Sequence, residues 1–355
     1  MVKDRLYTAA TGGPLMTGEN RFKIDGYSHI SPPRYTEILR NDFPEMYSQI
    51  LAVTPTMWDM EARFKVMDAH GPVAQVLTVG PVPPIEVFAG GKRTVELAKV
   101  ANDEMAELIS KYPHRFLAAI ALLPMNDAEA AVAEAERAIK ELGFKGAYVH
   151  TNVNGKPLDS PEFLPLFELL AAYDLPLYIH PWRGNDFPDY LTESESKYAI
   201  ASTFGWPYET TVAMTRLVFS GLLERFPGLK VITHHLGGMV AYYEQRIVQH
   251  YGQVQSKYHD YREYLEGLSK PPIEYYKMFY ADTAIHGNTP ALMLAYSFWG
   301  ADHIIFGADF PLGDPQFGMR SYAQTIGAIE AMDITEAEKE LIFGGNIKRL
   351  LKLEA

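Results

Sequence analysis

Short apolar runs alternate with longer amphipathic segments along almost the whole chain. Eight runs are rich in β-branched and aliphatic residues, which is typical of strands buried on both faces. They are Phe22–Gly26, Val73–Val79, Phe116–Ala121, Gly146–Val149, Pro176–Ile179, Lys230–Thr233, Met278–Ala281 and His303–Phe306. The segments between them have the apolar spacing of helices. The pattern therefore predicts a strand followed by a helix, repeated eight times.

Three of the predicted helices carry clear start signals. Asp127 is a suitable N-cap for a helix expected over Ala128–Leu142. Ser160 is followed by a proline and an acidic residue, the usual order at a helix start. Thr335 opens the capping-box pattern TEAE, and we expect that helix to end near Gly344.

Eight strand–helix units predict an α/β fold of the (β/α)8 TIM-barrel type, as a single domain over residues 1–355 with an N-terminal extension at 1–20. The chain is longer than the roughly 250 residues typical of such barrels. We expect the surplus as insertions after the first and fifth strands, at residues 30–70 and 183–205. Both would lie on the face where barrel enzymes build their sites. A doubly wound sheet is the alternative, but no glycine-rich phosphate turn supports it.

Composition narrows the classes of function. The formal charge is 32 − 44 = −12, which disfavours nucleic acid and anionic membranes as partners. The chain has no cysteine, so any metal must be bound by histidine and carboxylate side chains. The start of the chain does not resemble a secretory signal, and no apolar run approaches the roughly 20 residues of a membrane span. We therefore expect a cytoplasmic protein.

Polar side chains stand where five of the predicted strands end. They are Asp25 to His29, His180 to Arg183, the pair His234 and His235, the pair Asp282 and Thr283, and Asp309. In a barrel these ends meet at one mouth. Imidazole and carboxylate together suit Zn²⁺ or another divalent transition metal, with a position left open for catalysis. Taken singly, each residue also has a structural interpretation, as a core histidine or a capping aspartate. His150, after the fourth strand, is a candidate for the lining.

Longer stretches resemble the amidohydrolase superfamily, in the branch of aminocarboxymuconate-semialdehyde decarboxylase and related non-oxidative decarboxylases. The resemblance runs from Ile24 to about Leu350. It is carried by IDGYSHISPP, RFKVMDAHGPVAQVLTV, ELGFKGAYV, YIHPW, GWPYETTVAMTRLVFSGLLERFPGLKVITHHLGG and IIFGADFPLG, and the stretch from Gly205 to Gly238 is the most specific. The resemblance implies metal ligands at His29, His180 and Asp309, with Asp309 also a proton carrier.

The resemblance also assigns catalytic and partner residues. His235 matches the histidine of the H-x-G-G motif, an acid/base or polarising group, whereas His234 is expected to pack or to support the site. Arg246 follows His235 by 246 − 235 = 11 residues, which matches an arginine that reaches into the neighbouring subunit's site. This implies a homodimer. An ordinary surface arginine has the same appearance.

Two positions depart from the family pattern. Tyr27 stands where the family usually has a histidine or glutamate ligand, and neutral tyrosine is a poor ligand because its pKa is about 10. His29, His180 and Asp309 still suffice for a catalytic site. We expect one divalent metal, Zn first and Mn as the alternative, bound weakly or not at all because of Tyr27. Leu51 stands where a second substrate arginine is expected, which argues against the same substrate.

These residues predict a metal-dependent, non-oxidative decarboxylase of a small aromatic or conjugated carboxylic acid. His235 and Asp309 would be catalytic. The expected substrate-binding residues are Tyr27, Trp182, Arg183, Trp206, Asp282 and Arg246, and Phe204 and Tyr208 could extend an apolar wall. Two alternatives stay open. The same site could hydrolyse an ester, lactone or amide, or the barrel could bind a ligand without turnover. The sequence leaves the substrate and the metal undetermined.

Overall fold

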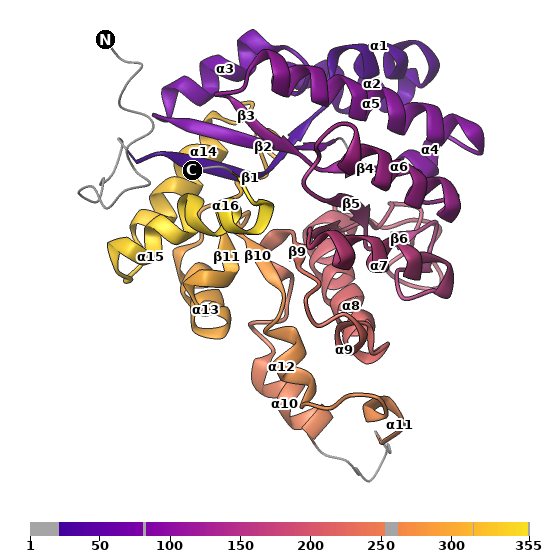
Figure 1. The fold of residues 1–355 in the computed structure, drawn as a ribbon, viewed down its shortest axis with the longest axis vertical. Coiled ribbons are helices and arrows are strands. Elements are labelled where there is room, and N and C mark those ends of the chain that lie inside the picture. The colour runs from indigo at the N-terminus through magenta and orange to yellow at the C-terminus, as the bar shows by residue number, and fades with distance from the viewer. Residues whose placement is uncertain (1–20, 81–82, 253–261, 315, 354–355) are drawn as a thin grey trace.

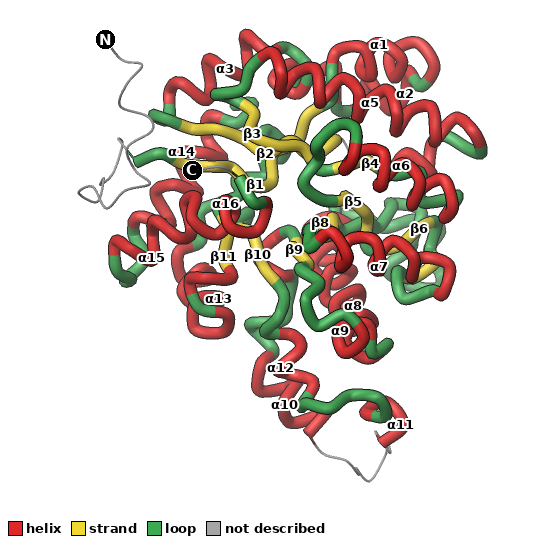
Figure 2. The backbone as a smooth tube through the Cα atoms, in the orientation of Figure 1, coloured by secondary structure: helices red, strands yellow, loops and turns green. Residues whose placement is uncertain are grey.

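The computed structural model describes residues 21–80, 83–252, 262–314 and 316–353 (Figure 1). The predicted extension at 1–20 lies outside the described residues. The strands of the barrel lie at the centre of the molecule, and the helices surround them (Figure 2). The strands are β1 Lys23–Ile30, β2 Val73–Val79, β3 Phe116–Ala119, β4 Ala121–Leu122, β5 Ala147–His150, β8 Leu177–His180, β9 Val231–Thr233, β10 Tyr280–Asp282 and β11 Ile304–Ile305.

Hydrogen bonds close these strands into one ring. Strands β1, β2 and β3 pair in parallel, and so do β4, β5, β8, β9, β10 and β11 in that order. Strands β3 and β4 are one strand interrupted at Ile120, whose N–H donates to Leu77 O at 2.9 Å. On the other side, Gly26 N–H donates to Phe306 O at 2.8 Å, which joins β1 to the chain after β11. The predicted (β/α)8 barrel is thus confirmed.

The remaining elements lie outside the ring. The helices are α1 Pro33–Asp42, α2 Pro44–Gln49, α3 Met60–Ala69, α4 Ile85–Phe88, α5 Lys92–Lys111, α6 Ala128–Lys140, α7 Leu164–Tyr173, α8 Trp206–Phe219, α9 Leu222–Arg225, α10 Glu244–Gly252, α11 Arg262–Leu265, α12 Pro272–Tyr276, α13 Thr289–Trp299, α14 Met319–Glu330, α15 Glu336–Glu340 and α16 Asn346–Leu351. Short 3₁₀ turns are η3 Leu51–Val53, η4 Pro55–Met57, η5 Pro161–Phe163, η7 His235–Gly237 and η8 Ala301–His303. Two segments are π-helical, η6 Ala201–Gly205 and η9 Leu341–Gly345. A small hairpin, β6 Asn152–Val153 with β7 Lys156–Pro157, follows β5.

The helix signals in the sequence had different outcomes. The Asp127 side chain accepts from Ala130 N–H, and Thr335 forms the complete capping box. Ser160 makes no side-chain cap, and a 3₁₀ turn precedes α7. The predicted helix end near Gly344 is wrong, because the chain passes through η9 and continues as α16 to Leu351. The buried face of α16 against the core outweighs the helix-breaking tendency of the glycines.

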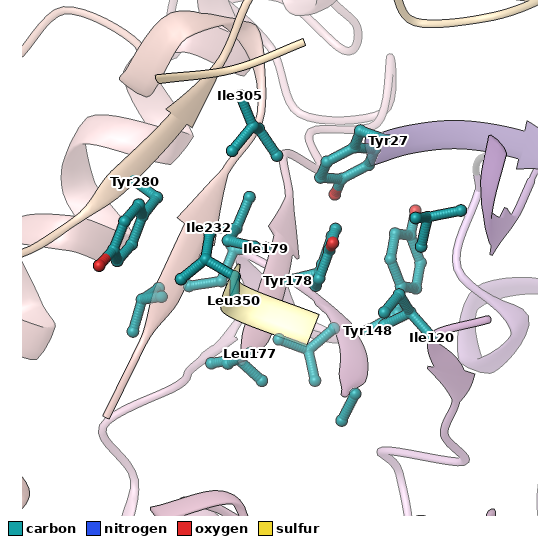
Figure 3. Packing of buried hydrophobic residues seen from close by; sticks show 14 of the residues in the cluster. Tyr27, Ile120, Tyr148, Leu177, Tyr178, Ile179, Ile232, Tyr280, Ile305 and Leu350 are labelled. Atoms are coloured by element: carbon teal, nitrogen blue, oxygen red, sulfur yellow. The ribbon is translucent and has the colours of Figure 1, made fainter. Parts of the chain in front are cut away.

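Tyrosines fill the interior of the barrel. Tyr27 of β1, Tyr148 of β5 and Tyr178 of β8 are buried, and Figure 3 shows them side by side with Ile232 and Ile305. The ring centroids of Tyr27 and Tyr178 are 5.2 Å apart. Large rings that converge from separate strands leave no open channel, so the barrel interior is a packed core.

The long connections after β1 and β8 and a group of projecting helices complete the fold. Helices α1 to α3 occupy the long segment after β1, and a stretch with little regular structure leads from β8 to η6 and α8. Helices α10, α11 and α12 project away from the barrel (Figure 1). Among the residues described, no helix combines the length and the apolarity that crossing a membrane requires.

Candidate active site

Histidines and one aspartate from four separate strands meet at the carboxyl ends of the barrel strands. Asp309 is at the centre of this group. Its Oδ1 atom lies 3.3 Å from His29 Nε2 and 3.2 Å from His234 Nε2, and its Oδ2 atom lies 3.6 Å from His235 Nε2. The ring centroids of His29 and His180 are 5.2 Å apart. The fold therefore brings together residues that are 309 − 29 = 280 positions apart in the sequence.

The donor set fits a divalent metal. The ligand atoms of His29, His180 and His234 all lie within 4.8 Å of one another, and the same holds for His234, His235 and Asp309. His29 Nε2 is buried and has no hydrogen-bond partner among the described residues. A buried imidazole nitrogen without a partner carries a desolvation cost that a bound cation would remove. Nitrogen and carboxylate donors are those that zinc and manganese accept.

Hydrogen bonds at Nδ1 fix the orientation of the imidazoles of His180 and His29. His180 Nδ1 lies 2.7 Å from Pro181 O, and since a carbonyl only accepts, Nδ1 carries the proton. His29 Nδ1 lies 3.2 Å from Thr78 Oγ1, whose own proton is directed to Ser28 O. Both Nε2 atoms are therefore left as lone-pair donors toward the centre of the group, as in histidine ligands of metals.

His234 lies deeper in the site than its neighbour. It is fully buried, and its Nδ1 atom is hydrogen-bonded to Asp282 Oδ2. The Tyr27 ring stacks on it at a centroid distance of 4.3 Å. His235 lies nearer the mouth and stacks against Trp206 at 6.1 Å. From the sequence, His234 is expected only to pack or to support the site, whereas its Nε2 atom lies as close to Asp309 as that of His29 does.

The charged side chains of this buried group shift one another's pKa values. Burial opposes a charge on His234, but Asp282 and Asp309 outweigh it and raise the His234 pKa to about 10. Burial also opposes the charge of Asp309, yet His234 and the other imidazoles hold the Asp309 pKa well below its usual value. Burial lowers the pKa of His29 and His180, and it lowers that of His150 to about 3. These shifts favour a positive charge on His234 beside the Asp309 carboxylate, and they disfavour a charge on His29, His180 and His150.

Unusual backbone geometry presents two of these side chains. His235 has φ of 53° and Asp309 has φ of 56°, in the left-handed region that non-glycine residues seldom adopt. Gly237 follows in the same region, and a Cβ atom there would lie 2.4 Å from the Trp299 ring. Such strain persists only where the surrounding fold enforces it, and it gathers at functional sites.

Comparison with known proteins places this geometry in a family. The amidohydrolase family model matches residues 24–353. The chain belongs to the amidohydrolase family. It is 32% identical to gamma-resorcylate decarboxylase of Polaromonas sp., over 88% of this chain and 91% of that protein. It is 31% identical to 2-amino-3-carboxymuconate-6-semialdehyde decarboxylase of Dictyostelium discoideum, over 84% of this chain and 77% of that protein.

A solved structure gives the same result at the level of the fold. Dihydroxybenzoic acid decarboxylase from Polaromonas sp., solved with bound manganese and the inhibitor 2-nitroresorcinol, superposes with a TM-score of 0.77 at 29% identity. The match covers 94% of this chain and 97% of that one.

Not all of the expected substrate-binding residues of this amidohydrolase face the group around Asp309. Trp182 and Arg183 line a neighbouring cavity of about 570 Å³. Arg183 pairs with Glu209 at 3.1 Å and lies over the Phe187 ring at 3.9 Å. Its guanidinium therefore already has an ion-pair partner within the chain. Phe204 and Tyr208, the possible extension of an apolar wall, are exposed, whereas the Trp206 ring stacks on that of His235.

Arg246 lies at the surface of its own chain. It is exposed on α10, which belongs to the part of the amidohydrolase that projects from the barrel (Figure 1). Helix α10 begins at Glu244, and the residues between Gly252 and Arg262 lie outside the described residues. His150 does line the site region, since its ring centroid is 5.6 Å from that of His180.

Proposed function

We propose that this amidohydrolase is a metal-dependent, non-oxidative decarboxylase of a small aromatic carboxylic acid. The observation that carries the proposal is the group of imidazoles around Asp309 at the carboxyl ends of the strands. The relatives above, which are decarboxylases by name and cover most of the chain, support the choice of reaction. Hydrolysis by the same residues is the competing reaction.

The proposed cofactor is one divalent metal held by His29, His180 and Asp309. Manganese is supported by the metal in the solved structure of the related Polaromonas enzyme, and zinc by the preference of imidazole and carboxylate donors for it. When bound, the cation would act as a Lewis acid that stabilises negative charge on the substrate during loss of CO₂. Its ligands come from three different strand ends, so the barrel itself fixes their spacing.

Asp309 and His235 would transfer the proton that replaces the departing CO₂ on the ring carbon. In the reaction the bond between the ring carbon and the carboxylate breaks, CO₂ leaves, and the electron pair left on the ring carbon takes a proton. A proton taken up from solvent by His235 or Asp309 would be delivered to that carbon, and Asp309 Oδ2 lies 3.6 Å from His235 Nε2, which is too far for direct transfer between the two in this geometry. Trp206, stacked on His235, would hold the imidazole in place and present an apolar surface to a flat substrate.

Release of CO₂ tests the proposed reaction. The purified protein, loaded with Mn²⁺ or Zn²⁺, is expected to release CO₂ from at least one acid in a panel of hydroxybenzoates and related aromatic acids. Asp309→Asn is expected to reduce the rate by about 10²-fold or more, because proton transfer by a positioned side chain contributes about that much. Asp174→Asn, at an exposed position before the start of β8 and thus at the opposite end of that strand from His180, is the control and should keep the wild-type rate.

Two results would contradict the proposal. A protein that carries stoichiometric metal and releases no CO₂ from the whole panel is not the proposed enzyme. Turnover of an ester, lactone or amide with oxygen from labelled water in the product would establish hydrolysis instead.

We further propose that the enzyme is a homodimer in which Arg246 serves the partner's site. Two observations support this. Arg246 is exposed on the projecting helix α10, and Tyr242 and Tyr243 beside that helix are also exposed. An arginine is suited to a substrate carboxylate because its guanidinium can donate two parallel hydrogen bonds.

A further inference from the structure

We propose that His234 is a further protein ligand of the divalent metal, held in position by Asp282 and by the Tyr27 ring. The inference rests on the metal site of the proposed function and adds a residue to it. It would make the site a set of three imidazoles and one carboxylate, from His29, His180, His234 and Asp309. Three features of the described residues carry it.

The first feature is the distance between donor atoms. Ligands about 2.0–2.2 Å from one cation lie roughly 3.0–3.5 Å from one another. Asp309 Oδ1 lies 3.3 Å from His29 Nε2 and 3.2 Å from His234 Nε2. His234 thus stands in the same relation to Asp309 as His29 does, and its ligand atom lies within 4.8 Å of those of His29 and His180.

The second feature is the partner of the other ring nitrogen. His234 Nδ1 is hydrogen-bonded to Asp282 Oδ2, while Asp282 Oδ1 accepts from Leu236 N–H at 3.2 Å and from Ala284 N–H at 3.1 Å. Backbone donors therefore hold the carboxylate, and the carboxylate holds the proton on Nδ1. This arrangement of carboxylate, imidazole and cation is the usual one behind histidine ligands, and it leaves Nε2 free to bind.

The third feature is the packing around the ring. The Tyr27 ring lies nearly parallel to that of His234, with centroids 4.3 Å apart and an interplanar angle of 19°. The His180 ring is 4.9 Å away and the His235 ring 3.9 Å away. The hydroxyl of Tyr27 is buried without a partner in the barrel interior, near Tyr178 (Figure 3). Tyr27 therefore acts through its ring face, as a positioning residue for His234.

Wild-type protein with Mn²⁺ as the probe gives the direct test. Pulsed electron paramagnetic resonance counts the imidazole nitrogens coupled to the bound ion. Three are expected, one each from His29, His180 and His234. A count of two, with His234 remaining an imidazolium between Asp282 and Asp309, would overturn the inference. This measurement needs no variant and no turnover.

Variants give a second test through the affinity for Mn²⁺, measured by calorimetric titration. His234→Gln is expected to weaken binding by more than about 100-fold and to lower the nitrogen count by one. Asp282→Asn is expected to weaken binding by about 10–100-fold, as loss of the supporting carboxylate of a histidine ligand does. His235→Gln is the matched control at the adjacent position and should change the affinity less than fivefold. Equal losses for His234→Gln and His235→Gln would contradict the assignment.

The outcomes separate this inference from the proposed function. Wild-type protein that binds no Mn²⁺ or Zn²⁺ would overturn both. Three coupled nitrogens without CO₂ release would uphold the role of His234 and overturn the decarboxylase. CO₂ release with two coupled nitrogens would uphold the decarboxylase and overturn the role of His234.

Discussion

Asp25 shows how a single buried side chain can make the stability of this amidohydrolase depend on pH. It is fully buried, and it accepts from Tyr322 Oη–H at 2.8 Å and from Tyr27 N–H at 3.2 Å. Burial nevertheless dominates and raises the Asp25 pKa to about 7. The folded protein thus keeps this carboxyl group protonated at pH values where the unfolded chain has already lost the proton.

The sign of the pH effect follows from linkage. Below about pH 4 both states hold the proton, so Asp25 carries no ionisation penalty. As the pH rises from about 4 to about 7, the unfolded state releases the proton and the folded state does not, so folding becomes less favourable. Asp25→Asn should remove this contribution. Unfolding by urea at pH 4.5 and pH 7.5 should show that the variant gains stability relative to wild type at the higher pH.

The control for this prediction is Asp127→Asn, at an N-cap on the outer surface where the amide can still accept. Its difference from wild type should be nearly constant between the two pH values. If Asp25→Asn and wild type differ by the same amount at both pH values, the buried carboxyl group does not titrate in this range.

At the scale of elements, a bulge in β1 decides which side chains face the interior. The pairing of β1 with β2 shifts register between Asp25 and Ser28. Before the shift, Asp25 points outward to Tyr322 of α14. After it, Tyr27 contacts the interior tyrosines and His29 contacts Asp309. A regular strand would alternate its side chains and place Asp25, Tyr27 and His29 on the same face.

The turn after β9 is the second element on which the site depends. Gly237 has φ of +70°, and a Cβ atom there would lie 2.4 Å from the Trp299 ring. Gly237→Ala should therefore destabilise the protein by about 2–4 kcal/mol, as overpacking and a strained left-handed residue together do. Because the turn also carries His235, the rate of CO₂ release should fall as well. Thermal unfolding and turnover would measure the two effects.

Gly228→Ala is the matched control for this turn. Among the described residues, no atom lies within 4 Å of the place where a Cβ atom at Gly228 would be. The substitution should change the free energy of unfolding by less than about 1 kcal/mol, with either sign. Equal effects of the two substitutions would mean that the Gly237 turn can relax away from Trp299.

At the scale of the whole molecule, the projecting helices α10 to α12 carry Arg246, which we propose to serve the partner's site in a dimer. If Arg246 serves the partner's site, two inactive variants can restore each other. In a mixed dimer of Asp309→Asn and Arg246→Ala, one site has both defects and the other has neither. Random mixing of subunits in equal amounts should return about a quarter of the wild-type sites.

This complementation is measured as CO₂ release after the two variants are unfolded and refolded together. Each variant refolded alone is the control. No activity above the sum of the separate variants would mean that Arg246 acts in its own chain or not at all. Sedimentation analysis of the wild type should first show a dimer, since a monomer contradicts the arrangement directly.

The alternation of apolar runs and amphipathic segments was enough to predict the eight strands and the barrel. Both signals are local, because the period of buried positions along a strand or helix is set by backbone geometry. The same reasoning placed His29, His180, the pair His234 and His235, and Asp309 at one mouth, because parallel strands of a barrel end on one face, and the family resemblance then chose His235 from the pair as the catalytic residue. The positions of these residues in the sequence do not give the distances between their side-chain atoms.

Only the tertiary structure decided which of two adjacent histidines is buried deeper in the site and where the last helix ends. His234 and His235 are adjacent and both approach Asp309, but only His234 is hydrogen-bonded to Asp282 and stacked on Tyr27, whereas His235 stacks on Trp206. The glycines at η9 do not end the helix, because burial of α16 against the core outweighs their local preference. These outcomes depend on contacts between residues far apart in the chain. The sequence encodes the contacts, but only the folded chain brings them together.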